Sequence, residues 1–194
     1  MKVTVDPFRP IYPTPAAMIT SIAPDGTPNI ITLGEVYNLS LRQPAIVGIG
    51  IHKARYSHEL ISQTREYVVN LPTVTLVEAV DRCGCISGRE VDKFSAFGLT
   101  PLPADVVKPP LIAECPINIE CTVRDIVEVG DHDTFMGEVV AVHADEELLD
   151  EQGRVCMDRL DTFCFLFCYG SRGEYWTLGK KLADAWYTRR LGKE

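Results

Sequence analysis

Lys53, Arg55 and Ser57 are the residues whose types and spacing best suit the binding of an anion. They follow the apolar run at residues 45–51, which is rich in β-branched residues and predicts a buried strand. The residues after this run predict a helix, with Ser57 as its N-cap. A helix N-terminus presents unpaired backbone N–H groups, and a guanidinium and a hydroxyl beside it would complete a phosphate site. A solvated basic turn after a core strand is the alternative explanation.

Two glycine-containing stretches could also approach a ligand. Gly34 lies in the segment 32–36, where it would permit close backbone approach to a planar ligand, although a bend between strands explains it as well. Ser87, Gly88 and Lys93 come later and could cover an anionic ligand. A capped surface loop without a ligand is the alternative explanation for these three residues.

His132 lies in a turn at residues 130–133, whose glycine and aspartates are typical of a β-hairpin. Its imidazole can exchange a proton near neutral pH, which makes it a candidate for catalysis. A solvated turn histidine is the alternative.

The seven cysteines form no metal-binding pattern. Cys83 and Cys85 are separated by one residue, which is poor spacing for zinc, and no second pair complements them. We therefore predict no metal site. The odd number and irregular spacing of the cysteines also argue against a secreted disulfide framework and favour a reducing cytoplasm.

The length and the charge narrow the class of protein. A chain of 194 residues with 46% hydrophobic and 24% charged residues suits one globular domain, which we expect to span residues 1–194. The formal net charge of −8 argues against a nucleic-acid partner. No signal peptide and no membrane span is recognisable, so we expect a cytoplasmic protein.

Short strands dominate the hydrophobic pattern, with short helices between them. The clearest strand is 117–129, whose alternation slips near Asp125 and Ile126 as at a β-bulge. Residues 24–27 predict a hairpin turn, and the four prolines within 99–110 predict a loop or an edge. We expect strands at 16–23, 29–33, 44–51, 67–71, 117–129, 135–143, 163–169 and 174–177, and helices at 56–65, 75–82, 91–97 and 180–191. This order favours an antiparallel barrel over a βαβ sheet.

Taken in order, these pieces resemble the flavin reductase-like family, most closely its flavoredoxin branch. The resemblance runs from about residue 13 to residue 179, and its strength comes from several motifs in the same order, since none is diagnostic alone. The motifs are residues 25–29 (DGTPN), 55–60 (RYSHEL), 87–100 (SGREVDKFSAFGLT), 111–116 (LIAECP), 130–133 (GDHD) and 137–140 (GEVV).

The resemblance implies a mainly β fold, an FMN-binding antiparallel split β-barrel with short flanking helices. It also implies a homodimer with the flavin near the subunit interface. The site residues that it implies are Thr32, Leu33, Gly34, Glu35 and Val36 along the isoalloxazine edge; Lys53, Arg55, Tyr56, Ser57 and His58 around the phosphate; Ser87, Gly88 and Lys93 in a flanking loop of the same or a second subunit; and Asp131 and His132 where nicotinamide docks.

One pair of residues departs from the family pattern. Gly34 and Glu35 stand where relatives more often carry serine followed by an aromatic or small residue. A carboxylate near a flavin disfavours a negatively charged reduced state, so the redox role is open at this point.

Three functions fit the resemblance. The first is an oxidoreductase that takes a hydride from NADH or NADPH and reduces flavin, iron or another small acceptor. The second is an electron-transfer protein that keeps its FMN and exchanges electrons with a protein partner. The third is a flavin-storage barrel without turnover. The chain carries no G-x-G-x-x-G fingerprint, so a nicotinamide would have to dock on the flavin itself.

Overall fold

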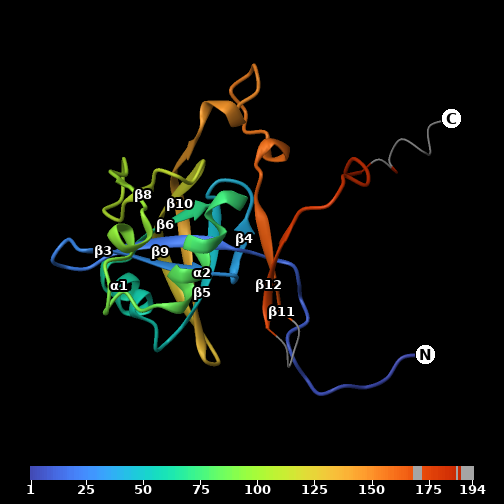
Figure 1. Cartoon of the computed structure of the whole chain (residues 1–194), viewed down its shortest axis with the longest axis horizontal. Coiled ribbons are helices and arrows are strands. Elements are labelled where there is room, and N and C mark those ends of the chain that lie inside the picture. The colour runs from blue at the N-terminus through green and yellow to red at the C-terminus, as the bar shows by residue number, and fades with distance from the viewer. Residues whose placement is uncertain (168–171, 187, 189–194) are drawn as a thin grey trace.

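The structure, a computed structural model, describes residues 1–167, 172–186 and 188. Its body is an antiparallel sheet of seven strands in the order β3-β2-β6-β9-β10-β5-β4, curled into a split barrel (Figure 1). These strands are β2 (Ala17–Ile22), β3 (Pro28–Leu33), β4 (Val36–Ser40), β5 (Ile46–His52), β6 (Glu66–Leu71), β9 (Ile117–Val129) and β10 (His132–Ala144). The mainly β, antiparallel split-barrel fold is thus confirmed.

The barrel interior is filled by every second residue of its strands. Ile19 from β2, Ile49 and Ile51 from β5, and Phe135 from β10 are fully buried in one cluster. Successive strand residues point to opposite faces, which explains the alternation of the sequence. Tyr67 is also buried there, and its hydroxyl donates to the Val47 carbonyl at 2.9 Å, which satisfies the polar end of the side chain.

Two of the hairpins follow the sequence closely. β2 and β3 are joined by the predicted turn, in which Gly26 has a positive φ of 90° that glycine adopts without strain. In the β9–β10 pair, Arg124 is the extra residue of a bulge, next to the predicted slip at Asp125. β4 was not predicted, because its residues are partly exposed and show no continuous apolar run.

In the part of the chain that the structure describes, three α-helices lie against the barrel: α1 (Tyr56–Thr64), α2 (Val77–Cys85) and α3 (Lys93–Phe97). They confirm the helices predicted at 56–65, 75–82 and 91–97, with shifted ends. A 3₁₀ turn, η1 (Val74–Leu76), precedes α2, which then continues to Cys85. Two further 3₁₀ turns are η2 (Glu146–Leu148) and η3 (Met157–Arg159).

The predicted N-cap of α1 is wrong. Arg55 has the extended conformation of the N-cap, with φ −79° and ψ 142°, and makes no side-chain cap. Ser57 is the second helical residue and turns its side chain to another partner, described below.

Two small sheets complete the fold. β1 (Thr14–Pro15), β11 (Phe163–Phe167) and β12 (Gly173–Thr177) form a three-stranded ribbon beside the barrel (Figure 1). β7 (Pro101–Leu102) pairs with β8 (Leu111–Ile112) across the proline-rich loop. The predicted strand at 163–169 is confirmed as far as Phe167, and residues 168 and 169 lie outside the described residues.

The helix predicted at 180–191 is wrong over its described part. Residues 180–184 are irregular and 185–186 form a turn, while 187 and 189–191 lie outside the described residues. Leu182 is 99% exposed and Trp186 is 72% exposed, so the predicted apolar stripe is not buried against the barrel. Short helices depend on such packing for their stability. Among the described residues, no helix combines the length and the hydropathy that crossing a membrane would require.

Candidate functional site

The start of α1 is held by the end of β5. The backbone N–H of Arg55 donates to the His52 carbonyl at 2.9 Å, and that of Ala54 donates to His52 Nδ1 at 3.1 Å. Residues in the first turn of a helix have no intrahelical partner for their N–H groups, and the helix dipole makes this end positive. The tight turn therefore holds the first-turn N–H groups of α1 at a fixed place, together with the side chains of Arg55 and Ser57.

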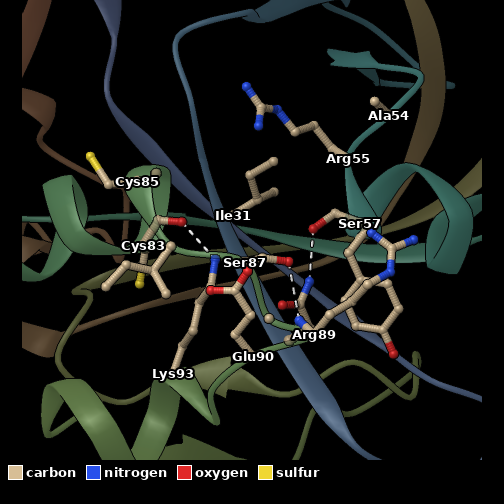
Figure 2. Close-up of a pocket in the computed structure, with 15 residues that line it drawn as sticks. Ile31, Ala54, Arg55, Ser57, Cys83, Cys85, Ser87, Arg89, Glu90 and Lys93 are labelled. Carbon is tan, nitrogen blue, oxygen red and sulfur yellow. Dashed lines mark hydrogen bonds between the residues drawn. The ribbon is translucent and has the colours of Figure 1, made fainter.

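A pocket of about 180 Å³, here called the α1 pocket, opens at this place (Figure 2). It brings Arg55, Tyr56 and Ser57 together with Ser87, Gly88 and Lys93, which join it from the loop between α2 and α3. The other lining residues are Asn29, Ile31, Ala54, Cys83, Gly84, Cys85, Ile86, Arg89 and Glu90. The lining thus carries three basic side chains and one acidic side chain, in a chain with a net charge of −8.

Ser57 belongs to a buried hydrogen-bond network at the floor of the α1 pocket. Asn29 Nδ2 donates to Ser57 Oγ at 2.8 Å and to Ser21 Oγ at 3.3 Å. Ser57 is 2% exposed and Asn29 is 4% exposed. Because Ser57 Oγ accepts from Asn29, the hydroxyl proton is left to donate to another group.

Gly88 is the point where the flanking loop passes closest to this network. A Cβ atom at Gly88 would lie 1.8 Å from Asn29 Oδ1, so any other residue would clash there. The amide oxygen has no hydrogen-bond partner within the described part of the chain. The backbone at Gly88 therefore covers the buried amide of Asn29 and closes the floor of the α1 pocket.

Lys93 is buried beneath the α1 pocket rather than exposed over it. Its ammonium donates to the Ile30 carbonyl at 2.6 Å and to the Cys83 carbonyl at 2.7 Å. Burial lowers the pKa of Lys93, and the charge of Arg55 adds to this effect. The two carbonyls tie α3 to β3 and to the C-terminal turn of α2, and the ammonium brings a positive charge to the pocket wall.

Arg89 was not among the predicted site residues, although it follows Ser87 and Gly88 directly. Its guanidinium carbon lies 4.6 Å from the centre of the Tyr56 ring, and it donates to Glu59 at 2.6 Å. It thus connects the flanking loop to α1 at the rim of the α1 pocket. Arg89 and Asn29 both stand inside motifs that carried the resemblance, but the sequence offered no sign of which residues there face the pocket.

A second pocket of about 260 Å³ adjoins the α1 pocket through Gly84 and Cys85, which line both. Thr32 and Gly34 line it, as do the aromatic rings of Phe165 and Tyr175. Gly34 has a structural reason to be glycine, since a Cβ there would lie 2.8 Å from Thr14 Oγ1.

Three other residues of the segment 32–36 serve other purposes in this chain. Leu33 is buried in the barrel core, and Val36 packs against the same cluster. Glu35 forms an ion pair with Arg9 of the N-terminal segment, which partly neutralises the carboxylate that departs from the family pattern.

Lys53 and His58 lie outside the lining of the α1 pocket. Lys53 pairs with Glu128 and lies 3.5 Å from Asp133, and His58 Nε2 lies 2.8 Å from Asp133 Oδ2. The hydrogen bond to His58 lowers the pKa of Asp133, as does the charge of Lys53. These side chains tie the start of α1 to β9 and β10, so their predicted contact with phosphate stays a prediction.

Asp131 and His132 lie at the tip of the β9–β10 hairpin, and neither lines the two pockets. His132 Nδ1 lies 2.8 Å from Asp131 Oδ1, and this hydrogen bond lowers the pKa of Asp131. The His132 ring also meets the His52 ring edge-on, with 5.3 Å between their centres. Their predicted catalytic role is therefore not supported by proximity within one chain.

One further group, Asp105, Glu120 and His143, has the residue types of a metal site. Glu120 Oε1 accepts from the Asp105 N–H at 2.9 Å and from His143 Nε2 at 2.6 Å. Its Oε2 accepts from the N–H groups of Val106 and Val107 at 2.8 and 2.9 Å. The carboxylate is thus fully used in holding the proline-rich loop to the barrel.

The arrangement at the α1 pocket fits the phosphate end of a ligand such as FMN. An anion there would meet the first-turn N–H groups of α1, the Ser57 hydroxyl and the Arg55 guanidinium. The adjoining second pocket offers aromatic and backbone surface of the kind that contacts a flat ring.

The sequence matches the model of the family described as "Flavin reductase like domain" over residues 9–159. Among solved structures, it is similar to flavoredoxin of Desulfovibrio vulgaris (Miyazaki F), with 28% identity and a TM-score of 0.88 over 97% of this chain and 100% of that chain. Flavoredoxin from Methanosarcina acetivorans is 29% identical, with a TM-score of 0.87 over 98% of both chains. An FMN-binding protein from Thermus thermophilus is 25% identical, with a TM-score of 0.76 over 95% of this chain and 97% of that chain.

Proposed function

The chain belongs to the flavin reductase-like family, on its flavoredoxin branch, and we propose that it is an FMN-binding oxidoreductase that accepts electrons from NADH or NADPH. The single observation that carries the proposal is the α1 pocket. It joins Arg55 and Ser57 at a helix N-terminus to the loop of Ser87 and Gly88, and a second pocket for a ring adjoins it.

The residues of the α1 pocket hold the phosphate in this proposal. Arg55 supplies a guanidinium, which forms stronger hydrogen bonds to phosphate oxygens than a neutral donor does. Ser57 supplies its free hydroxyl proton, and the first turn of α1 supplies backbone donors. One compact site of this kind suits the single phosphate of FMN, whereas FAD carries a diphosphate for which the sequence shows no second motif.

The second pocket contributes surface for the flavin ring. Thr32 Oγ1 donates to the Val80 carbonyl at 2.5 Å, which fixes β3 against α2 beside this pocket. Gly34 keeps the adjacent backbone free of a side chain. Bound FMN would supply the hydride and electron chemistry, while these residues orient the ring and keep water from part of its surface.

An electron-transfer role is the second candidate, and the likeness to two flavoredoxins favours it. In that case the protein keeps its FMN and exchanges electrons with a protein partner rather than with a small acceptor. The neutralisation of Glu35 by Arg9 is compatible with either role.

We also propose that the protein works as a homodimer. Large apolar side chains are exposed on the N-terminal segment, on β12 and on the segment that follows β12. In Figure 1, the segment after β12 runs away from the barrel. Phe8, Trp176, Leu178 and Leu182 are examples, with Trp176 54% and Leu182 99% exposed. Large apolar side chains are ordinarily exposed in such numbers where a second chain covers them.

The role of His132 in hydride transfer depends on this assembly, because its hairpin lies away from both pockets of its own chain. We expect the His132→Ala variant to keep its FMN and to reduce it at least about tenfold more slowly, a barrier increase of roughly 1.4 kcal/mol. An unchanged rate would assign His132 to the hairpin turn alone.

Anaerobic mixing of the FMN-loaded protein with each nucleotide tests the function directly. We expect NADH or NADPH to reduce the bound FMN, which is observed as a loss of flavin absorbance after mixing. If neither nucleotide bleaches it, while chemically reduced protein passes electrons to a redox protein, the electron-transfer role replaces the enzyme.

A further inference from the structure

Asp81 is a charged residue on the wall of the second pocket, and binding of the flavin ring there as proposed assigns it no role. It lies in the middle of α2 and lines this pocket together with the aromatic rings of Phe165 and Tyr175. Among the described residues that line the second pocket, no other side chain carries a full charge. A ring bound in this pocket would therefore lie beside one carboxylate in otherwise apolar or neutral surroundings.

Tyr175 holds this carboxylate in place. The Tyr175 hydroxyl donates to Asp81 Oδ1 at 3.0 Å, which connects β12 to α2. The Tyr175 ring is itself packed edge-on against Phe163, with 5.6 Å between the ring centres, and at 5.7 Å from the centre of Phe165. Burial raises the pKa of Tyr175, and the hydrogen bond to Asp81 raises it further, so the phenol stays protonated and remains a donor. The carboxylate is thus fixed at the pocket wall.

The charge of Asp81 is not balanced by a cation. On the same helix, Glu78 forms an ion pair with Arg82 at 2.9 Å. Asp81 forms no ion pair within the described part of the chain, and its second oxygen, Oδ2, lies 4.0 Å from the Cys85 sulfur. A phenol and a thiol are neutral, so they leave the negative charge of the carboxylate in place.

A ligand anchored by its phosphate in the α1 pocket would extend toward Asp81. Cys85 lines both pockets, and in Figure 2 its side chain lies on the opposite side of the α1 pocket from Ser57. A chain that starts at Ser57 and passes Cys85 therefore brings its ring into the second pocket. Asp81 is exposed in the free chain, where water screens its charge. A bound ring would displace water from one side of the carboxylate, and its charge would act more strongly there.

We propose that Asp81 lowers the reduction potential of the bound flavin, and that Tyr175 is the positioning residue that keeps the carboxylate beside the ring. A hydride brings two electrons and one proton to the flavin, so the ring gains one negative charge. The carboxylate repels this charge and leaves the neutral oxidised ring almost unaffected. Reduced flavin is therefore bound less tightly and passes its electrons more readily to an acceptor. The inference rests on the proposed binding of FMN and adds the residue that adjusts its potential.

The midpoint potential of the FMN-loaded protein tests the inference, measured by anaerobic equilibrium reduction with dithionite against a reference dye. We expect Asp81→Asn to raise the ratio of the affinities for reduced and oxidised FMN at least about tenfold, which is roughly 30 mV for a two-electron couple. The affinity for oxidised FMN should stay within about threefold, which shows that the site is intact.

Tyr175→Phe tests the positioning role, because it keeps the aromatic wall and removes only the hydroxyl that holds Asp81. The carboxylate can then turn toward water, and we expect a smaller rise of the potential in the same direction. Glu78→Gln is the matched control, since it removes the same charge from the same helix at an exposed position that does not line the second pocket. It should leave the potential unchanged.

An unchanged or lower potential in Asp81→Asn, with FMN still bound, would overturn the inference while leaving the proposed function in place. An equal rise in Glu78→Gln would overturn it as well, because the effect would then come from overall charge. If the wild type does not bind FMN, the proposed function itself is wrong and the inference falls with it.

Discussion

Arg55 shows at the scale of one residue how a local sequence feature becomes a binding group. It is exposed, it occupies the N-cap position of α1, and its own N–H is held by the His52 carbonyl. The backbone that carries the guanidinium is therefore fixed before any ligand arrives. This preorganisation lowers the conformational entropy that binding would otherwise cost.

We expect Arg55→Ala to weaken FMN binding by about thirtyfold, or roughly 2 kcal/mol, because one charge-assisted hydrogen bond to the phosphate is lost. Riboflavin, which lacks the phosphate, should bind the variant and the wild type alike. Fluorescence titration of both flavins measures these affinities. Arg124→Ala removes an exposed arginine that faces Glu138 at 3.6 Å and serves as the control. A matching loss in that variant would mean that the effect of Arg55 is only one of overall charge.

Residue types alone could not separate pocket residues from their neighbours. Lys53, Arg55 and Ser57 alternate along the chain, yet the turn before α1 directs Lys53 to Glu128 and Asp133. Lys93 was expected at the ligand, and the structure buries its ammonium against two carbonyls of the fold. The partner of a charged side chain lies on a segment that is distant in the sequence. A single sequence does not show how such segments are aligned with one another.

At the scale of elements, the sequence predicted what periodicity controls. The strands with clear alternation or continuous apolar runs were found, and so was the bulge beside Asp125. β4 and the N-terminal end of α1 were missed or misplaced, because partly exposed strands and caps are decided by tertiary contacts. The helix expected at 180–191 shows the converse, since the apolar residues Leu182 and Trp186 of its described part are exposed and not packed into the core.

The proline-rich loop between β7 and β8 owes its position to Glu120, whose carboxylate accepts three backbone N–H groups and a bond from His143. Burial raises the pKa of Glu120, but these hydrogen bonds outweigh it, so the pKa is lowered on balance. A lowered pKa means that the contribution to folding is present above the unfolded value of about 4.3. It is lost as the pH falls through the folded value.

We therefore expect Glu120→Gln to lower the free energy of unfolding at pH 7 by about 2 kcal/mol. The neutral amide loses the charge-assisted hydrogen bonds, and its NH₂ group faces backbone N–H groups that need an acceptor. The difference from the wild type should shrink as the pH falls below about 4. Urea denaturation across this pH range measures both effects. Glu151→Gln, at an exposed position, should change neither. A deficit that stays constant down to acid pH would contradict the assignment.

At the scale of the whole molecule, the proposed dimer depends on the exposed apolar side chains of the two terminal segments. Leu182→Asp should therefore shift a dimer toward monomer by raising its dissociation constant at least about tenfold. It should not lower monomer stability, since Leu182 is 99% exposed in one chain. Light scattering over a dilution series measures the change. Leu41→Asp, in the β4–β5 loop and 83% exposed, is the control. A wild-type monomer at micromolar concentration with FMN bound would contradict the proposed dimer.

The central claim of this account is that the α1 pocket holds the phosphate of FMN. The most direct test is the affinity of the wild-type protein for FMN and for riboflavin, measured side by side by calorimetric titration. If the phosphate is bound by Arg55, Ser57 and the first turn of α1, FMN should bind at least about a hundredfold more tightly, roughly 2.7 kcal/mol. Equal affinities for the two flavins would contradict the claim, because the α1 pocket would then contribute nothing to the binding of the phosphate.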